Sequence, residues 1–276
     1  MRTSICFHIK CNGNAMNLRF SQYRLSKESS YGAALTIVGS GIWFLVLLNI
    51  LLQKNAIAGI FGLGIDGVFL WVFFRFMAAL FRARMFGNSI ALTKEQFPEL
   101  YDIFVDASQQ LGLKKTPEAF IYNSHGVMNA VAVMFARGRY VLLTSAIVEI
   151  EEHEQLRFII GHELAHHALG HLGFFKHVLR LPGCLVPFLY SAYSRAREFS
   201  CDAVGAALLE DKIHALTALQ MLACGARRLN SGLNPRAFAA QERHVPRIAG
   251  FCREIMMTHP RTTRRVERLM TVFSFD

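Results

Sequence analysis

The stretch Ile159-Ile160-Gly161-His162-Glu163-Leu164-Ala165-His166-His167 decides how the rest of the chain is interpreted. Residues four apart lie on one face of a helix, so His162 and His166 can offer two imidazoles to one metal ion. Glu163 lies one step round the helix and can reach a water on that metal. Zinc suits this arrangement, because it takes nitrogen ligands and leaves an open position for a water. The alternative is a helix that carries two surface histidines.

A metal site of this kind needs a third ligand, and Glu198 is a candidate. Glu198 and Asp202 lie four residues apart in a segment that we expect to be helical, so they share a face. A helix that brings Glu198 to the metal would complete a His-His-Glu site with one open position. Asp202 could then hold a ligand imidazole by its other nitrogen. The alternative is an exposed helix on which Arg195, Arg197 and Glu198 are solvated charges.

A ligand set made only of histidines fails by register. The longer motif His-Glu-x-x-His-x-x-Gly-x-x-His requires Gly at position 169 and His at position 172, and this chain has Leu169 and Leu172. His171 lies one residue short of the required position.

Four motifs together resemble the integral-membrane zinc metallopeptidase family that includes the heat-shock protease HtpX and the CAAX prenyl proteases. That family carries His-Glu-x-x-His, a later Glu-x-x-x-Asp, an upstream Asn-Ala pair on a strand, and a late His-Pro followed by Arg. In this chain the last two motifs are Asn129-Ala130, and His259-Pro260 with Arg265. The four motifs follow the family's order and cover roughly residues 93 to 270.

The resemblance implies a set of functional residues and an activity. The residues are the zinc ligands His162, His166 and Glu198, the general base Glu163, the supporting residues Asp202, His259 and Arg265, and the substrate-docking pair Asn129 and Ala130. An imidazole or guanidinium near the metal could stabilise the oxyanion of the reaction. The implied protein is a membrane-anchored zinc metalloendopeptidase with one Zn²⁺ per chain, which cleaves peptide or protein substrates in membrane quality control. The alternative is an inactive, zinc-binding membrane adaptor of the same fold.

The N-terminal third of the chain predicts a membrane anchor. Tyr31 to Leu52 is 22 residues without a charge, long enough to cross the hydrocarbon core as a helix. Ala56 to Phe74 follows a three-residue turn and is apolar apart from Asp66. Basic residues precede the first span, and Arg82 and Arg84 follow the second. The expected protein is a multi-pass protein of the cell (inner) membrane. The positive-inside rule places both ends of the hairpin, and therefore the catalytic region, in the cytoplasm.

Composition supports the same division of the chain. The 276 residues are 53% hydrophobic and carry a formal net charge of +10. The basic residues flank apolar stretches and form no basic strand with interleaved aromatic residues, which favours a lipid bilayer and not nucleic acid as partner. The six cysteines show no framework spacing, which fits free thiols in a reducing compartment. We expect a basic cytoplasmic segment (1–30), a transmembrane helical hairpin (31–84) and a zinc metallopeptidase domain (85–276).

The expected fold class is α+β and mostly helical, with a small sheet beside the metal helix of a zincin-like domain. Thr93 and Gln96 suggest a capping box at the start of a helix. Residues 170–193 are apolar but are broken by prolines, which predicts an interfacial or re-entrant loop. Periodicity and turn signals predict helices at 93–113, 154–169, 192–209 and 213–229, and strands at 119–122, 127–135 and 140–144.

Overall fold

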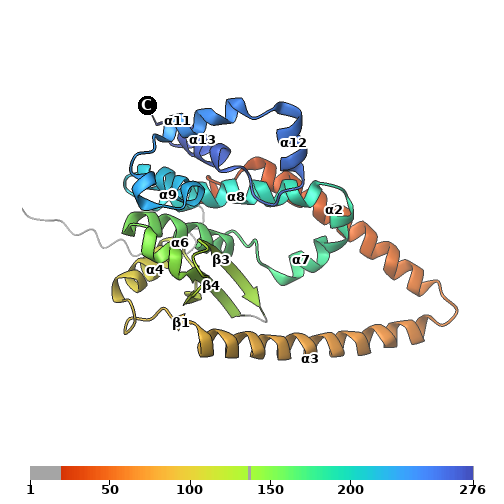
Figure 1. The fold of residues 1–276 in the computed structure, drawn as a ribbon. Helices are drawn as coiled ribbons and strands as arrows, with labels where there is room; N and C mark the ends of the chain where they lie inside the picture. Colours follow the sequence, from red (N-terminus) through yellow and green to blue (C-terminus); the bar gives the residue numbers. More distant parts are fainter. Residues whose placement is uncertain (1–19, 136–137, 276) are drawn as a thin grey trace, which may run out of the picture.

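The computed structural model describes residues 20–135 and 138–275, so most of the basic segment expected at 1–30 lies outside the described residues. The described chain is mostly helical with one small mixed sheet, which confirms the expected fold class (Figure 1). The helices are α2 (Ser26–Leu51), α3 (Ala56–Asn88), α4 (Pro98–Gln110), α5 (Ser145–Ile150), α6 (His153–Ala168), α7 (Phe174–Arg180), α8 (Leu189–Ala207), α9 (Ile213–Cys224), α10 (Arg227–Asn230), α11 (Pro235–Ala240), α12 (Arg247–Ile255) and α13 (Thr262–Val272), with 3-10 helices η1 (Leu181–Leu185) and η2 (Gln241–His244).

The sheet has the strand order β1-β2-β4-β3. Its strands are β1 (Ile90–Ala91), β2 (Glu118–Tyr122), β3 (Ala130–Phe135) and β4 (Gly138–Thr144). β2 and β4 are parallel, whereas β1 and β3 run antiparallel to their neighbours. The three strands expected from the sequence are present, and β1 is a fourth that is too short for a periodic signal. β3 pairs only with β4, so it forms one edge of the sheet.

Helix α6, which carries the His-Glu-x-x-His motif, lies in the core and not on the surface. It begins with a capping box in which the backbone N–H of Glu152 donates to Oε1 of Gln155 at 2.9 Å. Leu156, Ile160 and Leu164 are buried in the main hydrophobic cluster, and the helix packs against β3, α4, α8 and α9. The interpretation of the motif as two surface histidines is therefore wrong, because the side chains of His162 and His166 are only 8% and 13% exposed.

The backbones of α6 and α8 approach closely at a pair of glycines. A Cβ added to Gly161 would lie 2.6 Å from Cδ1 of Leu208 and 3.2 Å from Cα of Gly205. A Cβ added to Gly205 would lie 2.9 Å from the carbonyl oxygen of Phe158 and 3.0 Å from the backbone nitrogen of His162. At Gly205 any side chain would overlap the backbone of α6, so this glycine sets how near α8 comes to the motif on α6.

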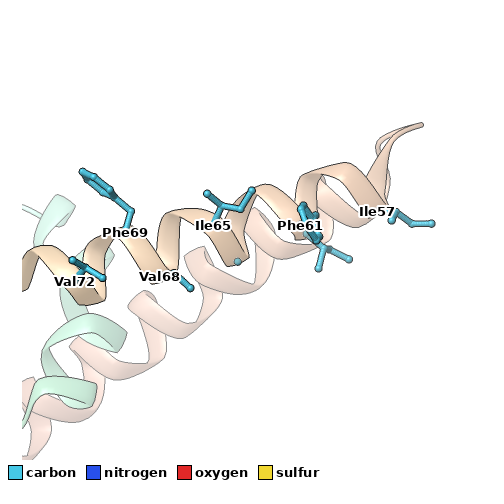
Figure 2. Close-up of a pocket in the computed structure, with 8 residues that line it drawn as sticks. Ile57, Phe61, Ile65, Val68, Phe69 and Val72 are labelled. Atoms are coloured by element: carbon cyan, nitrogen blue, oxygen red, sulfur yellow. The ribbon is translucent and has the colours of Figure 1, made fainter.

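Helices α2 and α3 are long and apolar enough to cross a membrane. In their most apolar windows 11% of α2 and 0% of α3 is buried inside the protein, so neither helix is a core helix. The two helices meet at the turn between them and diverge toward the rest of the molecule (Figure 1). Apolar side chains such as Ile57, Phe61 and Val72 line a shallow groove along α3 (Figure 2). Helix α2 begins at Ser26, five residues before the expected start of the first span.

The ambiguous segment 170–193 folds against the first long helix. Nε1 of Trp43 donates to the carbonyl oxygen of Val178 at 2.9 Å. Gly39 lets this segment approach, because a Cβ there would lie 2.1 Å from the carbonyl oxygen of Leu179. Phe175 and Leu185 remain exposed on the outer side. Residues 174–185 of the segment therefore form α7 and η1, both too short to cross a membrane and docked along α2, and α8 already begins at Leu189.

Two helix boundaries differ from the expectation for local reasons. The backbone N–H of Gln96 does donate to Oγ1 of Thr93, at 3.2 Å, but this closes a turn and not a helix. Phe97 then adopts a left-handed conformation (φ 58°), and α4 starts at Pro98, whose ring suits a first helical position. Helix α9 stops at Cys224 because Gly225 takes the left-handed C-terminal conformation (φ 71°), so the helix expected over 213–229 is two helices.

The α6–α8 crossing predicts the effect of adding one methyl group. Gly205→Ala should lower the free energy of unfolding by about 1–3 kcal/mol, because the new Cβ would overlap the backbone of α6. Thermal unfolding of the detergent-solubilised full-length protein measures the change. Gly62→Ala is the matched control, since a Cβ at this helical glycine of α3 meets nothing within 4 Å. An unchanged unfolding temperature for Gly205→Ala would contradict the close crossing.

Candidate metal centre and active site

The three expected metal ligands come together between α6 and α8. Nε2 of His162 lies 3.5 Å from Oε2 of Glu198, and Nε2 of His166 lies 3.6 Å from Oε1 of the same carboxylate. Ligand atoms about 2.0–2.2 Å from a tetrahedral zinc ion are themselves roughly 3.3–3.6 Å apart, so the donor set fits that ion. The exposed-helix alternative for Glu198 is wrong, because its side chain is buried against the two imidazoles.

Asp202 orients the first imidazole, and Arg265 holds Asp202. Nδ1 of His162 lies 2.9 Å from Oδ1 of Asp202, so the imidazole donates there and its Nε2 faces Glu198. Arg265 donates to the same carboxylate from Nε at 2.8 Å and from Nη2 at 2.6 Å. Burial alone would raise the pKa of Asp202, but the charge and hydrogen bonds of Arg265 lower it. Arg265 therefore lies behind His162, in contact with the carboxylate that holds the ring.

The second imidazole is oriented by a histidine instead of a carboxylate. Nδ1 of His166 lies 3.1 Å from Nδ1 of His171, and Nε2 of His171 lies 3.0 Å from Oε1 of Glu28 at the start of α2. Sγ of Cys201 on α8 lies 3.6 Å from the same Nδ1 of His171. Sequence reasoning considered His171 only as a metal ligand and did not consider Glu28. No local pattern links residues 28 and 171, which are 143 positions apart.

Glu163 lies beside the candidate metal site and is buried. Burial raises the pKa of its carboxyl group above the ordinary value, while the neighbouring His162 and a hydrogen bond from the backbone of Ala132 act in the opposite direction. Ala132 belongs to β3, the edge strand, so the edge of the sheet faces α6 at this carboxylate. His167 holds the other side of α6 to the sheet, with Nε2 3.1 Å from the carbonyl oxygen of Tyr140.

His259 reaches the site from the loop before α13. Its Nε2 lies 3.6 Å from Oε2 of Glu198, and its side chain is 63% exposed. Its other ring nitrogen, Nδ1, lies 3.1 Å from the hydroxyl of Thr258. His259 is thus the most exposed side chain of the cluster and lies on its solvent-facing side.

The pair Asn129-Ala130 lies at the start of the edge strand. Ala130 is the first residue of β3, and Asn129 precedes it by one residue. The backbone N–H of Asn129 donates to Oγ1 of Thr144 at 3.1 Å, and its carbonyl oxygen accepts from the backbone N–H of Thr144 at 3.1 Å. These bonds fix the entry into β3, while the Asn129 side chain remains exposed.

The charges within the cluster depend on each other. Burial would lower the pKa of His162, but its hydrogen bonds to Asp202 and Glu198 raise it to about 10. Burial would raise the pKa of Glu198, but His162 and His166 hold it well below the usual range. Burial and the nearby His162 lower the pKa of His166. Without an ion, the site therefore holds one protonated imidazole between two carboxylates, a charge that a divalent cation can replace.

Two known proteins and one family model are similar to most of this chain. The chain is 25% identical over 279 residues to the Protease HtpX homolog of Persephonella marina (strain DSM 14350 / EX-H1), covering 81% of this chain and 94% of that protein. A solved structure, S. mikatae Ste24p, aligns with a TM-score of 0.49 at 13% identity, covering 83% of this chain and 62% of the Ste24p chain. The model of Peptidase family M48 matches residues 94–185 and 174–272, so the chain belongs to this family of peptidases.

Proposed function

We propose that this chain is a membrane-anchored, zinc-dependent metalloendopeptidase that binds one Zn²⁺ and acts in membrane protein quality control. The observation that carries the proposal is the approach of two Nε2 atoms, from His162 and His166, to the carboxylate of Glu198. Membership of family M48 supports hydrolysis of peptide bonds, and two long apolar helices support an anchor in a lipid bilayer. Glu198, on a separate helix, completes a donor set typical of catalytic zinc.

The residues of the site divide the chemistry among them. A bound zinc ion would supply Lewis acidity, which polarises a carbonyl group and acidifies a water molecule. Glu163 takes a proton from the attacking water and passes it to the leaving amine. Its raised pKa suits both tasks, because a carboxyl group that titrates closer to neutral pH can accept and then donate a proton.

Two further residues act at different distances from the reacting atoms. His259 is exposed and stands beside Glu198, so its imidazole can donate to the oxyanion that forms on the scissile carbonyl. Arg265 is bound twice to Asp202, and we assign it to keeping that carboxylate charged and in place. In this proposal His259 assists the reaction that Glu163 catalyses, and Arg265 acts through Asp202 on the zinc ligand His162.

The edge of β3 is the proposed docking strand for the substrate. A strand that pairs on one side only can take an extended peptide as its next neighbour. Asn129 and Ala130 start this strand, and Ala132 approaches Glu163. A peptide bound along β3 would therefore pass beside the proton-transferring carboxylate.

The proposed membrane arrangement keeps the divisions expected from sequence. Residues 1–30 are basic and cytoplasmic, 31–84 form the transmembrane hairpin, and 85–276 form the peptidase domain on the cytoplasmic face of the cell membrane. The distribution of Lys and Arg around the hairpin supports this orientation. The competing function is an inactive adaptor with the same fold, which would bind zinc but would not cleave casein-type substrates.

Replacing Glu163 tests the hydrolase directly. Glu163→Gln should leave one zinc ion per chain and should lower peptide cleavage by about 10²-fold or more, because the amide cannot carry the proton. Metal analysis and a casein-type cleavage assay on the full-length protein measure the two effects. Glu149→Gln, an exposed carboxylate on α5, is the control and should keep full activity. Full proteolysis by Glu163→Gln would overturn the assignment, and zinc binding without turnover in the wild type would favour the adaptor.

The pH dependence of zinc affinity tests the charge state of His162. Its pKa is about 10 in the ion-free protein, so below that pH the ion must displace a proton to bind. Zinc affinity should therefore rise with pH, by about tenfold per unit between about pH 6.5 and 8.5. Competition with a chelator of known affinity at each pH gives the slope. An affinity independent of pH would show that His162 is already neutral without the ion.

A further inference from the structure

The two imidazoles of the metal site are oriented in different ways. Asp202 lies on α8, the helix that also carries the ligand Glu198, and it holds His162 directly. Among the described residues, the partner at the second nitrogen of His166 is His171 and not a carboxylate. Its Nδ1 faces Nδ1 of His171 at 3.1 Å, so one of these two nitrogens must donate and the other must accept.

The carboxylate of Glu28 decides which nitrogen donates. A carboxylate can only accept, so Nε2 of His171 carries the proton that bonds to Oε1 of Glu28 at 3.0 Å. Nδ1 of the neutral His171 ring is then an acceptor, and it takes a proton from Nδ1 of His166. Nε2 of His166 is left with its lone pair directed at the metal position. With both rings neutral, this arrangement of protons satisfies the contact between His166 and His171 and the contact between His171 and Glu28.

Glu28 is buried, although an acidic residue at the start of a helix does not need to be. It lies in the first turn of α2, where an acidic residue is favourable even when it is solvated. Here its side chain is 0% exposed, and Nε of Arg24 donates to it at 2.8 Å. The backbone N–H of Leu25 donates to Oγ of Ser200 at 3.0 Å, which ties the start of α2 to α8. Burying a charged carboxylate is unfavourable in free energy. We therefore look for a function in the contact between Glu28 and His171.

We propose that Glu28 and His171 form a positioning relay that runs from the first membrane helix to the metal ligand His166. The proposal rests on the proposed zinc site and adds two residues to it. Neither residue touches the metal. Glu28 fixes the tautomer of His171, and His171 fixes the tautomer and the ring plane of His166, as carboxylates behind zinc-bound histidines usually do. Zinc affinity then depends on how α2 packs against α8, because this packing positions Glu28.

Zinc affinity without substrate tests the relay, measured by competition with a chelator on the full-length protein in detergent. Glu28→Leu and His171→Leu should each weaken Zn²⁺ binding by about 10- to 100-fold, the usual effect of losing a group behind a ligand. His171→Gln should keep most of the affinity, because its amide oxygen can accept from His166 while its NH₂ group donates to Glu28. Equal affinities for His171→Leu and His171→Gln would overturn the relay.

The double variant separates a relay from a loss of packing. If Glu28 acts through His171, then Glu28→Leu should have little further effect on zinc affinity in the His171→Leu background. Multiplied losses in the double variant would overturn the relay. Thr36→Val is the matched control on α2: it removes the hydroxyl that accepts from Nε of Arg180 at 2.9 Å and should leave zinc affinity unchanged. A loss of affinity in Thr36→Val equal to that in Glu28→Leu would also overturn it.

Two further readouts keep the outcomes distinct. The visible absorption spectrum of the Co²⁺-loaded protein should change in His171→Leu and stay close to the wild type in His171→Gln, because it reports ligand geometry. A second Zn²⁺ that binds the wild type and is lost in Cys201→Ser would mean that His166, His171 and Cys201 hold an ion themselves, and would overturn the relay. A wild-type protein that binds no Zn²⁺ contradicts the proposed function, whereas wild-type affinity in both Glu28→Leu and His171→Leu contradicts the relay alone.

Discussion

The close contact between the backbones of α6 and α8 is the constraint on which the site depends. Gly161 and Gly205 remove the side chains that would hold the two helices apart. With the helices this close, a carboxylate on α8 reaches both imidazoles on α6, and Asp202 one turn later reaches the back of His162. The donor set is therefore a result of packing, and the buried charges within it offset one another.

Local patterns predicted the parts of this site that lie within single elements. The four-residue spacing of His162 and His166, and that of Glu198 and Asp202, places each pair on one helix face, and the structure has both helices. The strand signals before α6 were also sufficient to predict β2, β3 and β4. That α6 and α8 meet was a hypothesis drawn from the need for a third ligand and then from the family resemblance. Spacing along one helix contains no information about its neighbour.

The parts that sequence reasoning missed depend on contacts between distant segments. Phe97 and Gly225 move helix ends through left-handed backbone conformations that periodicity does not register. β1 has two residues and exists because β2 offers it a partner. Glu28 was not considered, because it lies in a polar stretch ahead of a membrane span and only the folded chain places it beside His171.

Helix α2 has two roles, since most of its apolar length faces outward whereas Glu28, in its first turn, is buried beside His171. A soluble version of the enzyme made by starting the chain after α3 would lose the buried carboxylate together with the anchor. The ring of His171 and the hydroxyl of Ser200 would then each lack a partner that the intact chain provides. Removing the two long apolar helices therefore also removes a buried carboxylate from the part of the chain that carries the metal-site residues.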